Sequence, residues 1–367
     1  MQNFLSALEK EIMVYAEHYS AKETVETIFF GGGTPSLLAP SIIENILSAV
    51  QKHFRITPDA EITIETNPGT VDLEKLRAYR SLGVNRLSIG IQSFHDDELK
   101  FLSRIHTADE ARECVRNAYR AGFENVSVDL IFALPGQTLE RWNRNLTEAL
   151  ALQPKHISAY SLIVEEHTPL YSMVKSGAVT PLDESNDAAM YETTIELLES
   201  RGFQHYEISN YALPGFESRH NSNYWNHSNY LGFGPSAHSF WLDSSSGKNS
   251  DASGATSSNG RRWWNVRNVT QYYEKLKGGA LPLGGEEHIG ASHLLDEAIF
   301  LGLRRGELNT AALQQCYGVD FLAEHKKRLQ QFVDDHFLFI EGSRIRLTQK
   351  GFLMCDSIAE SLMSISK

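Results

Sequence analysis

The chain has 367 residues, of which 41% are hydrophobic, and a formal net charge of -12. This length allows one large domain and one small domain, and the acidic balance argues against a nucleic-acid partner, because such binders present a basic face. The three cysteines, Cys114, Cys316 and Cys355, lie far apart in no CxxC or CxxxC spacing. They exclude a disulfide framework and a cysteine-only metal site built from this sequence, and they fit a reducing compartment. We therefore expect a cytoplasmic protein.

The opening segment MQNFLSALEKEIMVYAEHYS predicts an amphipathic helix rather than a secretory signal. No apolar run approaches the roughly 18 residues of a membrane span, so we expect no transmembrane segment. Short β-rich runs then alternate with helical patterns. The runs are Val25–Phe30, Glu61–Glu65, Arg86–Ile91, Asn125–Phe132 and His156–Ile163, and the helical patterns are Pro40–His53, Val71–Leu82, Ala108–Ala121 and Leu139–Leu152. Such alternation implies parallel strands joined by right-handed crossovers.

Five predicted strands are too few for an eight-stranded barrel, so the expected fold is α/β, a partial, open parallel β/α barrel. The chain begins with a helix where the pattern would place a strand, and we expect the first βα unit to be missing. The expected domains are the partial barrel at 1–210, an aromatic and His-rich region at 211–285 with a low-complexity loop at 243–260, and a winged-helix-like domain at 286–367. The mixed charges of the last domain disfavour DNA binding.

Ligands of parallel α/β folds bind beyond the carboxyl ends of the strands. The first predicted strand is followed by Gly31–Gly33, whose bare backbone could grip an ammonium–carboxylate ligand. Near the ends of later strands, Glu65 could hold a cationic amine, Arg104 a carboxylate and Asp129 a pair of ribose hydroxyls. An amino-acid–nucleoside ligand would satisfy all three. The alternatives are a tight turn for the glycines and helix-cap or ion-pair roles for the acids. GGGTPS fits neither the dinucleotide nor the P-loop fingerprint.

The sequence resembles the radical S-adenosylmethionine proteins, in the group of the oxygen-independent coproporphyrinogen III oxidases. The resemblance rests on an ordered series of motifs that covers nearly the whole chain: FFGGGTPSLL, IETNPGT, RLSIGIQSF, LSRIHT, VDLIFALPGQT, HISAYSLIVEEHTPL, YEISNYALPGFESRHNSNYW, LGFGPSAHSF and RLTQKGF. The HNSNYW stretch is similar to the HNxxYW signature of the HemW-type branch, the haem chaperones. The true decarboxylases have a different sequence at that place.

This resemblance implies two binding sites. The first is for S-adenosylmethionine and would comprise Gly31, Gly32, Gly33 and Thr34 along the methionyl group, with Glu65, Gln92, Arg104 and Asp129 making polar contacts to the rest of the ligand. The second is for haem, near His220, Tyr224 and Trp225, with a haem-acceptor protein as partner. Histidine is a common axial ligand of haem iron and aromatic rings suit a flat macrocycle. The alternative for His220 is an ordinary hydrogen-bonding histidine, and His227 and His238 are weaker candidates.

The sequence departs from the family pattern at two places. The family has a CxxxCxxC loop after its first strand, whose three thiolates hold a [4Fe–4S] cluster, and no such loop occurs here. A start assigned too far downstream, a shortened coding sequence or a natural cluster-free relative would each explain this. We expect no reductive cleavage of S-adenosylmethionine by the chain as written. The second departure is His167, in EEHTPL, where the family usually has glycine.

Together these features predict a haem-binding chaperone whose intact form binds S-adenosylmethionine and a [4Fe–4S] cluster, and they leave its status as an enzyme open. One alternative is an oxygen-independent coproporphyrinogen III oxidase, which catalyses oxidative decarboxylation. Others are a cluster-free ligand-binding relative and an unrelated partial-barrel enzyme acting on a sugar or phosphorylated metabolite. For the last, the sequence offers no paired catalytic carboxylates with a nearby histidine and no phosphate loop.

Overall fold

The computed structural model describes residues 2–243 and 259–363, and the chain divides into two compact units. The first, which we call the barrel unit, comprises Glu26–Ile43 and Asp59–Ser218. The second unit comprises Met1–Val25, Glu44–Pro58 and Arg219–Lys367. Most of the low-complexity loop predicted at 243–260 lies outside the described residues. The domain boundaries predicted at residues 210 and 285 stay a prediction.

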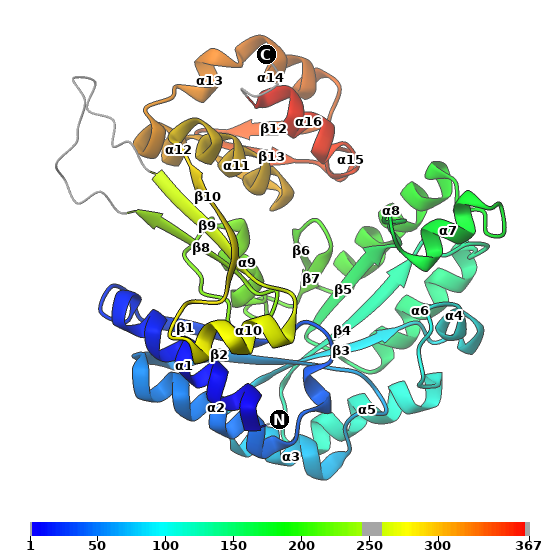
Figure 1. The fold of residues 1–367 in the computed structure, drawn as a ribbon. Coiled ribbons are helices and arrows are strands. Elements are labelled where there is room, and N and C mark those ends of the chain that lie inside the picture. The colour runs from blue at the N-terminus through cyan, green and yellow to red at the C-terminus, as the bar shows by residue number, and fades with distance from the viewer. Residues whose placement is uncertain (1, 244–258, 364–367) are drawn as a thin grey trace. The chain divides into compact units, whose positions relative to one another are not determined.

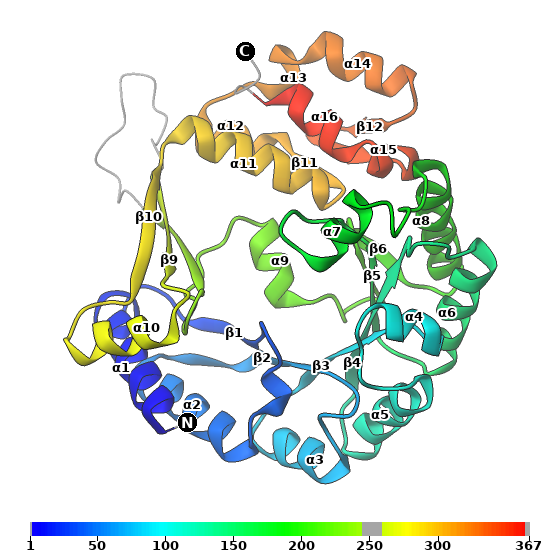
Figure 2. The same cartoon turned by 45° about the vertical axis from the view of Figure 1, so that its right-hand side comes forward.

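Seven strands form one curled sheet in the order β1-β2-β3-β4-β5-β7-β6 (Figures 1 and 2). The first five are β1 (Val25–Phe30), β2 (Ile56–Thr66), β3 (Arg86–Gln92), β4 (Asn125–Phe132) and β5 (His156–Ser161). The pairs from β2 to β5 are parallel, whereas β6 (Gln204–Glu207) and β7 (Asn210–Ala212) form an antiparallel hairpin that adds to β5. The open half-barrel predicted from the strand–helix alternation is confirmed.

Helices cover the convex face of this sheet (Figure 2). In the barrel unit they are α3 (Leu73–Ser81), α5 (Ala108–Arg120), α6 (Leu139–Ala151) and α8 (Glu184–Glu199). The unit also contains α4 (Asp96–Phe101), α7 (Pro169–Lys175) and the short 3-10 turn η1 (Pro35–Leu37) after β1. The residues before α3, α5, α6, α7 and α8 each accept a hydrogen bond from a backbone N–H of the first turn, which satisfies a donor that the helix leaves open.

The strands alternate between two kinds of side chain because successive residues point to opposite faces of a sheet. In β3 and β4, Leu87, Ile89, Val126 and Val128 are fully buried. The residues between them are polar, and they lie on the concave face. They are Arg86 and Ser88 in β3, and Ser127 and Asp129 in β4. The half-barrel is therefore apolar against its helices and polar on its concave side.

The second unit contains two small antiparallel sheets. One has the order β10-β9-β8, from β8 (His238–Asp243), β9 (Asn259–Asn265) and β10 (Leu283–Ile289), and the other has the order β11-β13-β12. The helices with residues in this unit are α1 (Gln2–Tyr19), α2 (Pro40–His53), α9 (Arg219–Trp225) and α10 (Val269–Lys277). The C-terminal elements are α11 (Ala291–Arg304), β11 (Glu307–Asn309), α12 (Thr310–Tyr317), α13 (Phe321–Glu324), α14 (Lys326–Asp334), β12 (Leu338–Glu341), β13 (Arg344–Leu347), α15 (Gln349–Leu353) and α16 (Cys355–Leu362).

This C-terminal segment has helices before and after the two-stranded β12–β13 hairpin, as a winged-helix-like domain would, and β11 adds a strand that the sequence did not indicate. Of the helices in the described parts of the chain, none combines the length and the apolar character that crossing a membrane requires.

A buried carboxylate ties α1 to the rest of the second unit. Glu11 accepts hydrogen bonds from the Gly234 amide at 2.9 Å, from Asn265 Nδ2 at 2.5 Å and from the Tyr272 hydroxyl at 2.6 Å. Further along the same helix, Tyr15 packs with Trp241 and Trp263 in an aromatic cluster. The first helix is thus held by both apolar burial and a polar anchor.

Candidate functional site

The loop after β1 brings its glycines against the end of β2. The Gly32 amide donates a hydrogen bond to Glu65 Oε2 at 3.0 Å. Gly32 and Gly33 have φ values of +79° and +64°, which residues with a Cβ adopt only at a cost. At Gly31 the reason is space, because a Cβ there would lie 3.2 Å from Glu65 Cδ and 2.4 Å from the Phe29 ring. The glycine run therefore both turns the backbone and admits the Glu65 carboxyl group.

A second space kept open by glycine lies at the end of β3. A Cβ on Gly90 would lie 2.8 Å from Asn67 Oδ1 and 2.8 Å from Gln92 Nε2. Gln92 has a φ of +71°, where the pairing of β3 with β4 shifts register. Asn67 Nδ2 in turn donates to Thr34 Oγ1 at 3.5 Å. Thr34, Asn67 and Gln92, which come from three different loops or strand ends, thus surround one small region.

Arg104 carries a buried N–H group without an acceptor. Its Nε atom has no hydrogen-bond partner among the described residues. Burial lowers the pKa of the Arg104 guanidinium, and the nearby charge of Asp129 opposes that shift. Buried donors are nearly always satisfied in folded proteins, and an unmade bond costs about 1–3 kcal/mol. The guanidinium is therefore prepared for an acceptor that the described residues do not provide.

Asp129 lies within a collar of serine hydroxyls on the concave face. Ser88 Oγ donates to its two carboxylate oxygens at 3.1 and 3.0 Å, and Ser127 Oγ lies 3.3 Å from Oδ1. The Ser158 side chain is a third partner. Burial raises the pKa of the Asp129 carboxyl group, and these hydrogen bonds and the charge of Arg86 work against the increase. The serines come from β3, β4 and β5, so the collar requires all three strands in register.

Glu65 and Asp129 are close enough to repel each other. Burial is the main cause of the raised pKa of Glu65, the Gly32 amide opposes it, and the Asp129 charge adds to it. Arg104 responds to the same Asp129 charge. The structure therefore brings Gly32, Glu65, Arg104 and Asp129 of the predicted set into one electrostatic neighbourhood, and Gly31, Gly33, Thr34 and Gln92 lie on the loops and strand ends beside them.

The sequence reasoning missed the residues that support Asp129. These are Ser88, Ser127 and Ser158 around the carboxylate, Asn67 beside Gln92, and Arg86. The polar–apolar alternation in RLSIG and NVSVD is the signal that could have indicated the first two serines.

The predicted haem residues lie on α9 in the second unit. His220 Nε2 and the Tyr224 hydroxyl are 3.1 Å apart, and their rings meet edge to face. Tyr224 is 40% exposed, and its ring also packs edge to face on Tyr230 at a centroid distance of 4.8 Å. Trp225, at the end of α9, is partly exposed. This helix thus presents an imidazole and an accessible aromatic ring side by side.

The two weaker histidine candidates have different surroundings. His227 Nε2 lies 2.9 Å from Glu297 Oε2, and its ring stacks on Phe240 with centroids 4.5 Å apart. His238 is exposed and stacks on Trp264 at 5.9 Å. His227 is therefore held by a carboxylate, which leaves His220 and His238 as the more accessible imidazoles of this stretch.

The cysteines do not form a metal site. Cys114 on α5 and Cys355 on α16 are buried, and Cys316 on α12 is exposed. Over residues 2–243 and 259–363, no three His, Cys, Asp or Glu side chains converge in a way that could hold a metal ion.

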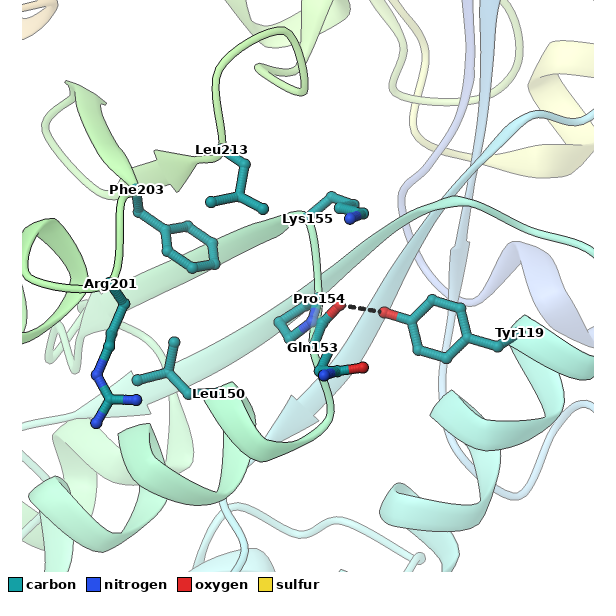
Figure 3. A pocket seen from close by; sticks show the side chains of 8 residues that line it. All are labelled: Tyr119, Leu150, Gln153, Pro154, Lys155, Arg201, Phe203 and Leu213. Carbon is teal, nitrogen blue, oxygen red and sulfur yellow. Dashed lines mark hydrogen bonds between the residues drawn. The ribbon is translucent and has the colours of Figure 1, made fainter.

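A separate pocket of about 500 Å³ lies at the opposite, amino-terminal end of β5 (Figure 3). Its wall combines apolar and polar side chains, among them the cations Lys155 and Arg201, which Figure 3 shows on different sides of the opening. The other lining residues are Tyr119, Leu150, Gln153, Pro154, Phe203 and Leu213. The Tyr119 hydroxyl donates to the Gln153 carbonyl at 2.7 Å, and this bond closes part of the wall. None of the predicted site residues lines this pocket.

Comparison with known proteins defines the class. The family model of the radical SAM superfamily matches residues 6–148, and that of the HemN C-terminal domain matches residues 291–354. Among solved structures, coproporphyrinogen III oxidase (HemN) from Escherichia coli aligns with a TM-score of 0.79 over 99% of this chain and 83% of that chain, at 23% sequence identity. The chain is thus built as a radical SAM protein with a HemN-type C-terminal domain.

Relatives in sequence narrow the assignment. The heme chaperone HemW of Lactococcus lactis is 32% identical over 345 residues, which cover 93% of this chain and 85% of the relative. The heme chaperone HemW of Bacillus subtilis is 31% identical over 360 residues, covering 98% and 90%. The chain belongs to the HemW family of haem chaperones. This confirms the family and the branch that the series of motifs predicted.

Proposed function

We propose that this chain is a haem-binding chaperone whose barrel unit binds S-adenosylmethionine at the carboxyl ends of β1 to β4. The observation that carries the S-adenosylmethionine site is the unpartnered, buried Nε of Arg104 beside the carboxylates of Glu65 and Asp129. A ligand with one carboxylate, one ammonium group and one vicinal diol supplies what each of these side chains lacks. The family suggests S-adenosylmethionine as the ligand, and the positions of Arg104, Glu65 and Asp129 support this choice.

Each part of S-adenosylmethionine has a matching group. Arg104 would donate hydrogen bonds to the methionyl carboxylate, since guanidinium–carboxylate pairs form strong charge-assisted bonds. Glu65 would face the ammonium group beside Gly31–Gly33, because the missing Cβ of Gly31 admits the Glu65 carboxyl group to this loop. Asp129 would accept hydrogen bonds from the ribose hydroxyls, with the serine collar holding its carboxylate in place.

A [4Fe–4S] cluster does not fit the cysteines of this sequence. Three thiolates must converge on such a cluster, whereas Cys114, Cys316 and Cys355 lie on three separate helices. We therefore assign no cluster ligand to these residues and derive no step through a cluster.

Haem would bind as cargo at α9. The relatives are named heme chaperones, and α9 supplies an imidazole with a half-exposed tyrosine ring beside it. Because His220 Nε2 is engaged with the Tyr224 hydroxyl, ligation through that nitrogen would release the hydroxyl. A haem-acceptor protein is the partner that this function requires.

The S-adenosylmethionine site is tested by isothermal titration of the purified chain. Arg104→Ala should weaken binding about 10- to 100-fold, because a hydrogen bond to a charged group contributes about 1.5–3 kcal/mol. The matched control is Arg116→Ala, which removes an exposed guanidinium on the outer helix α5. Equal affinities of Arg104→Ala and the unsubstituted chain would overturn the assigned site.

The haem site is tested by titrating haem and recording the Soret band. His220→Ala should shift the band and weaken binding, whereas His238→Ala, which removes an exposed histidine of the same unit, should change neither. A Soret band that is the same with and without His220 would refute this ligand. Decarboxylation of coproporphyrinogen III by the chain would instead favour the oxidase alternative.

A further inference from the structure

A continuous chain of hydrogen bonds runs inward from Asp129 through the interior of the barrel unit. Ser127 Oγ lies 3.3 Å from Asp129 Oδ1 and 2.7 Å from His156 Nδ1. The other nitrogen of the same ring, His156 Nε2, lies 2.7 Å from the Tyr206 hydroxyl. That hydroxyl accepts a hydrogen bond from the Ser218 amide at 3.2 Å. His156, Ser127 and Ser218 are fully buried.

The groups at the two ends of this hydrogen-bond chain determine which atom donates at each step. The Asp129 carboxylate can only accept, so Ser127 must use its one proton to donate to it. Ser127 Oγ can then only accept from His156, which requires the proton of the ring to be on Nδ1. His156 Nε2 is in that case an acceptor, and the Tyr206 hydroxyl donates to it while accepting from Ser218. In this arrangement the protons of Ser127, His156 Nδ1 and Tyr206 each have an acceptor.

The opposite tautomer leaves the carboxylate with one donor fewer. With the proton on Nε2, the ring donates to Tyr206, and Nδ1 accepts the proton of Ser127. Ser127 cannot then donate to Asp129, because a hydroxyl has a single proton. The Tyr206 proton would also lose its acceptor in the chain. The tautomer of one buried histidine therefore decides whether Asp129 has the full serine collar.

The surroundings keep the His156 ring neutral, as the hydrogen-bond chain from Asp129 to Ser218 requires. Burial lowers the pKa of His156 well below its usual value, and the charge of Arg86 lowers it further. The same Arg86 charge favours the ionised form of Asp129. A protonated ring would donate at both nitrogens and would have no nitrogen left to accept the Tyr206 proton. Arg86 thus supports both ends of the arrangement, a neutral imidazole and an ionised carboxylate.

We propose that His156 and Tyr206 are positioning residues of the nucleoside site: through Ser127 they direct a third hydroxyl donor at Asp129 and so fix the carboxylate that receives the ribose hydroxyls. The inference rests on the proposed binding of S-adenosylmethionine. Neither residue touches the ligand, so both act only through Ser127. Tyr206 sets the tautomer of His156, His156 orients the Ser127 hydroxyl, and the hydroxyl orients Asp129.

The tautomer can be observed directly and without ligand. In the full-length chain with ¹⁵N-labelled histidine, two-bond ¹H–¹⁵N spectra distinguish the Nδ1–H from the Nε2–H form, and His156→Asn identifies the signal. We expect the Nδ1–H form in the unsubstituted chain and a shift towards Nε2–H in Tyr206→Phe. An Nε2–H form in the unsubstituted chain, or no change in Tyr206→Phe, would overturn the proposal.

Binding measurements test the consequence. Tyr206→Phe and Ser127→Ala should each weaken S-adenosylmethionine binding about three- to tenfold, somewhat less than removal of a direct bond to a charged group. They should leave unchanged the weaker binding of an analogue that lacks both ribose hydroxyls. The double variant should lose no more affinity than Ser127→Ala alone, because both substitutions break one chain.

The control is Tyr119→Phe, which removes the hydroxyl that donates to the Gln153 carbonyl elsewhere in the barrel unit. This substitution should leave both affinities unchanged. Equal losses for S-adenosylmethionine and the analogue in Tyr206→Phe would show a merely structural role and refute the positioning role. If the unsubstituted chain binds no S-adenosylmethionine, the proposed function fails, and the histidine spectra still decide whether the chain of hydrogen bonds exists.

Discussion

The buried carboxyl group of Glu11 should make the stability of the second unit depend on pH. Burial raises the pKa of Glu11 from 4.5 to about 7, although its three hydrogen-bond donors act against that increase. Between these two values the unfolded chain has lost the Glu11 proton and the folded chain retains it. Folding therefore becomes less favourable as the pH rises through this window, because the folded state binds more protons.

The size of the effect follows from the two pKa values. One pKa unit corresponds to about 1.4 kcal/mol. Summed over protonation in both states, a change from pH 5 to pH 8 should lower the free energy of unfolding by about 2–3 kcal/mol through Glu11 alone. The stabilisation is fully present below pH 4.5 and is lost by about pH 7, where the folded-state group ionises. Glu11→Gln cannot ionise and should not show this component.

Urea unfolding at pH 5, 6, 7 and 8, followed by the fluorescence of buried tryptophans such as Trp263, measures this difference. The quantity to plot is the free energy of unfolding of the unsubstituted chain minus that of Glu11→Gln. Glu9→Gln is the matched control, since Glu9 is an exposed carboxylate on the same helix. Parallel pH curves for the unsubstituted chain and Glu11→Gln would refute the reasoning.

Three further predictions concern single positions. Gly90→Ala should weaken S-adenosylmethionine binding by about tenfold or more in calorimetry, because its Cβ would lie 2.8 Å from atoms of Asn67 and Gln92. His167→Gly should stabilise the barrel unit by up to about 1 kcal/mol in urea unfolding, because His167 has a φ of +68°, and a stability loss would contradict this. The same substitution at His95, with φ -113°, should be destabilising. A maleimide should label only Cys316 in the native chain, since burial raises the pKa of the other two thiols to about 12.

His167 illustrates how a departure from a family pattern acquires a physical reason. The resemblance marked His167 only as a histidine in place of a usual glycine. Its backbone conformation in the turn before α7 lies in the left-handed region, where glycine is favoured. The sequence identified the departure, and the dihedral angle explains it.

The barrel was predictable because its signals are local. Hydrophobic runs of strand length, helical periodicity and capping residues each involve neighbours in the chain, and all five predicted strands exist, with β2 beginning at Ile56 instead of Glu61. The missed elements lack such signals. The β6–β7 hairpin is short, and β10 contains Gly284 and Gly285, which weaken its strand propensity, so pairing with β9 is what makes it a strand.

By itself, the sequence determined the family, the alternation of strands and helices, and which polar residues follow each strand, because these depend on order along the chain. Only the tertiary structure decided how those residues act on one another. Ser88, Ser127 and His156 converge with Asp129 because the parallel strands β3, β4 and β5 are in register, and the antiparallel β6–β7 hairpin adds Tyr206. A hydrogen-bond chain forms only when each donor–acceptor distance is correct to within a few tenths of an ångström, and the packing of the whole half-barrel sets these distances.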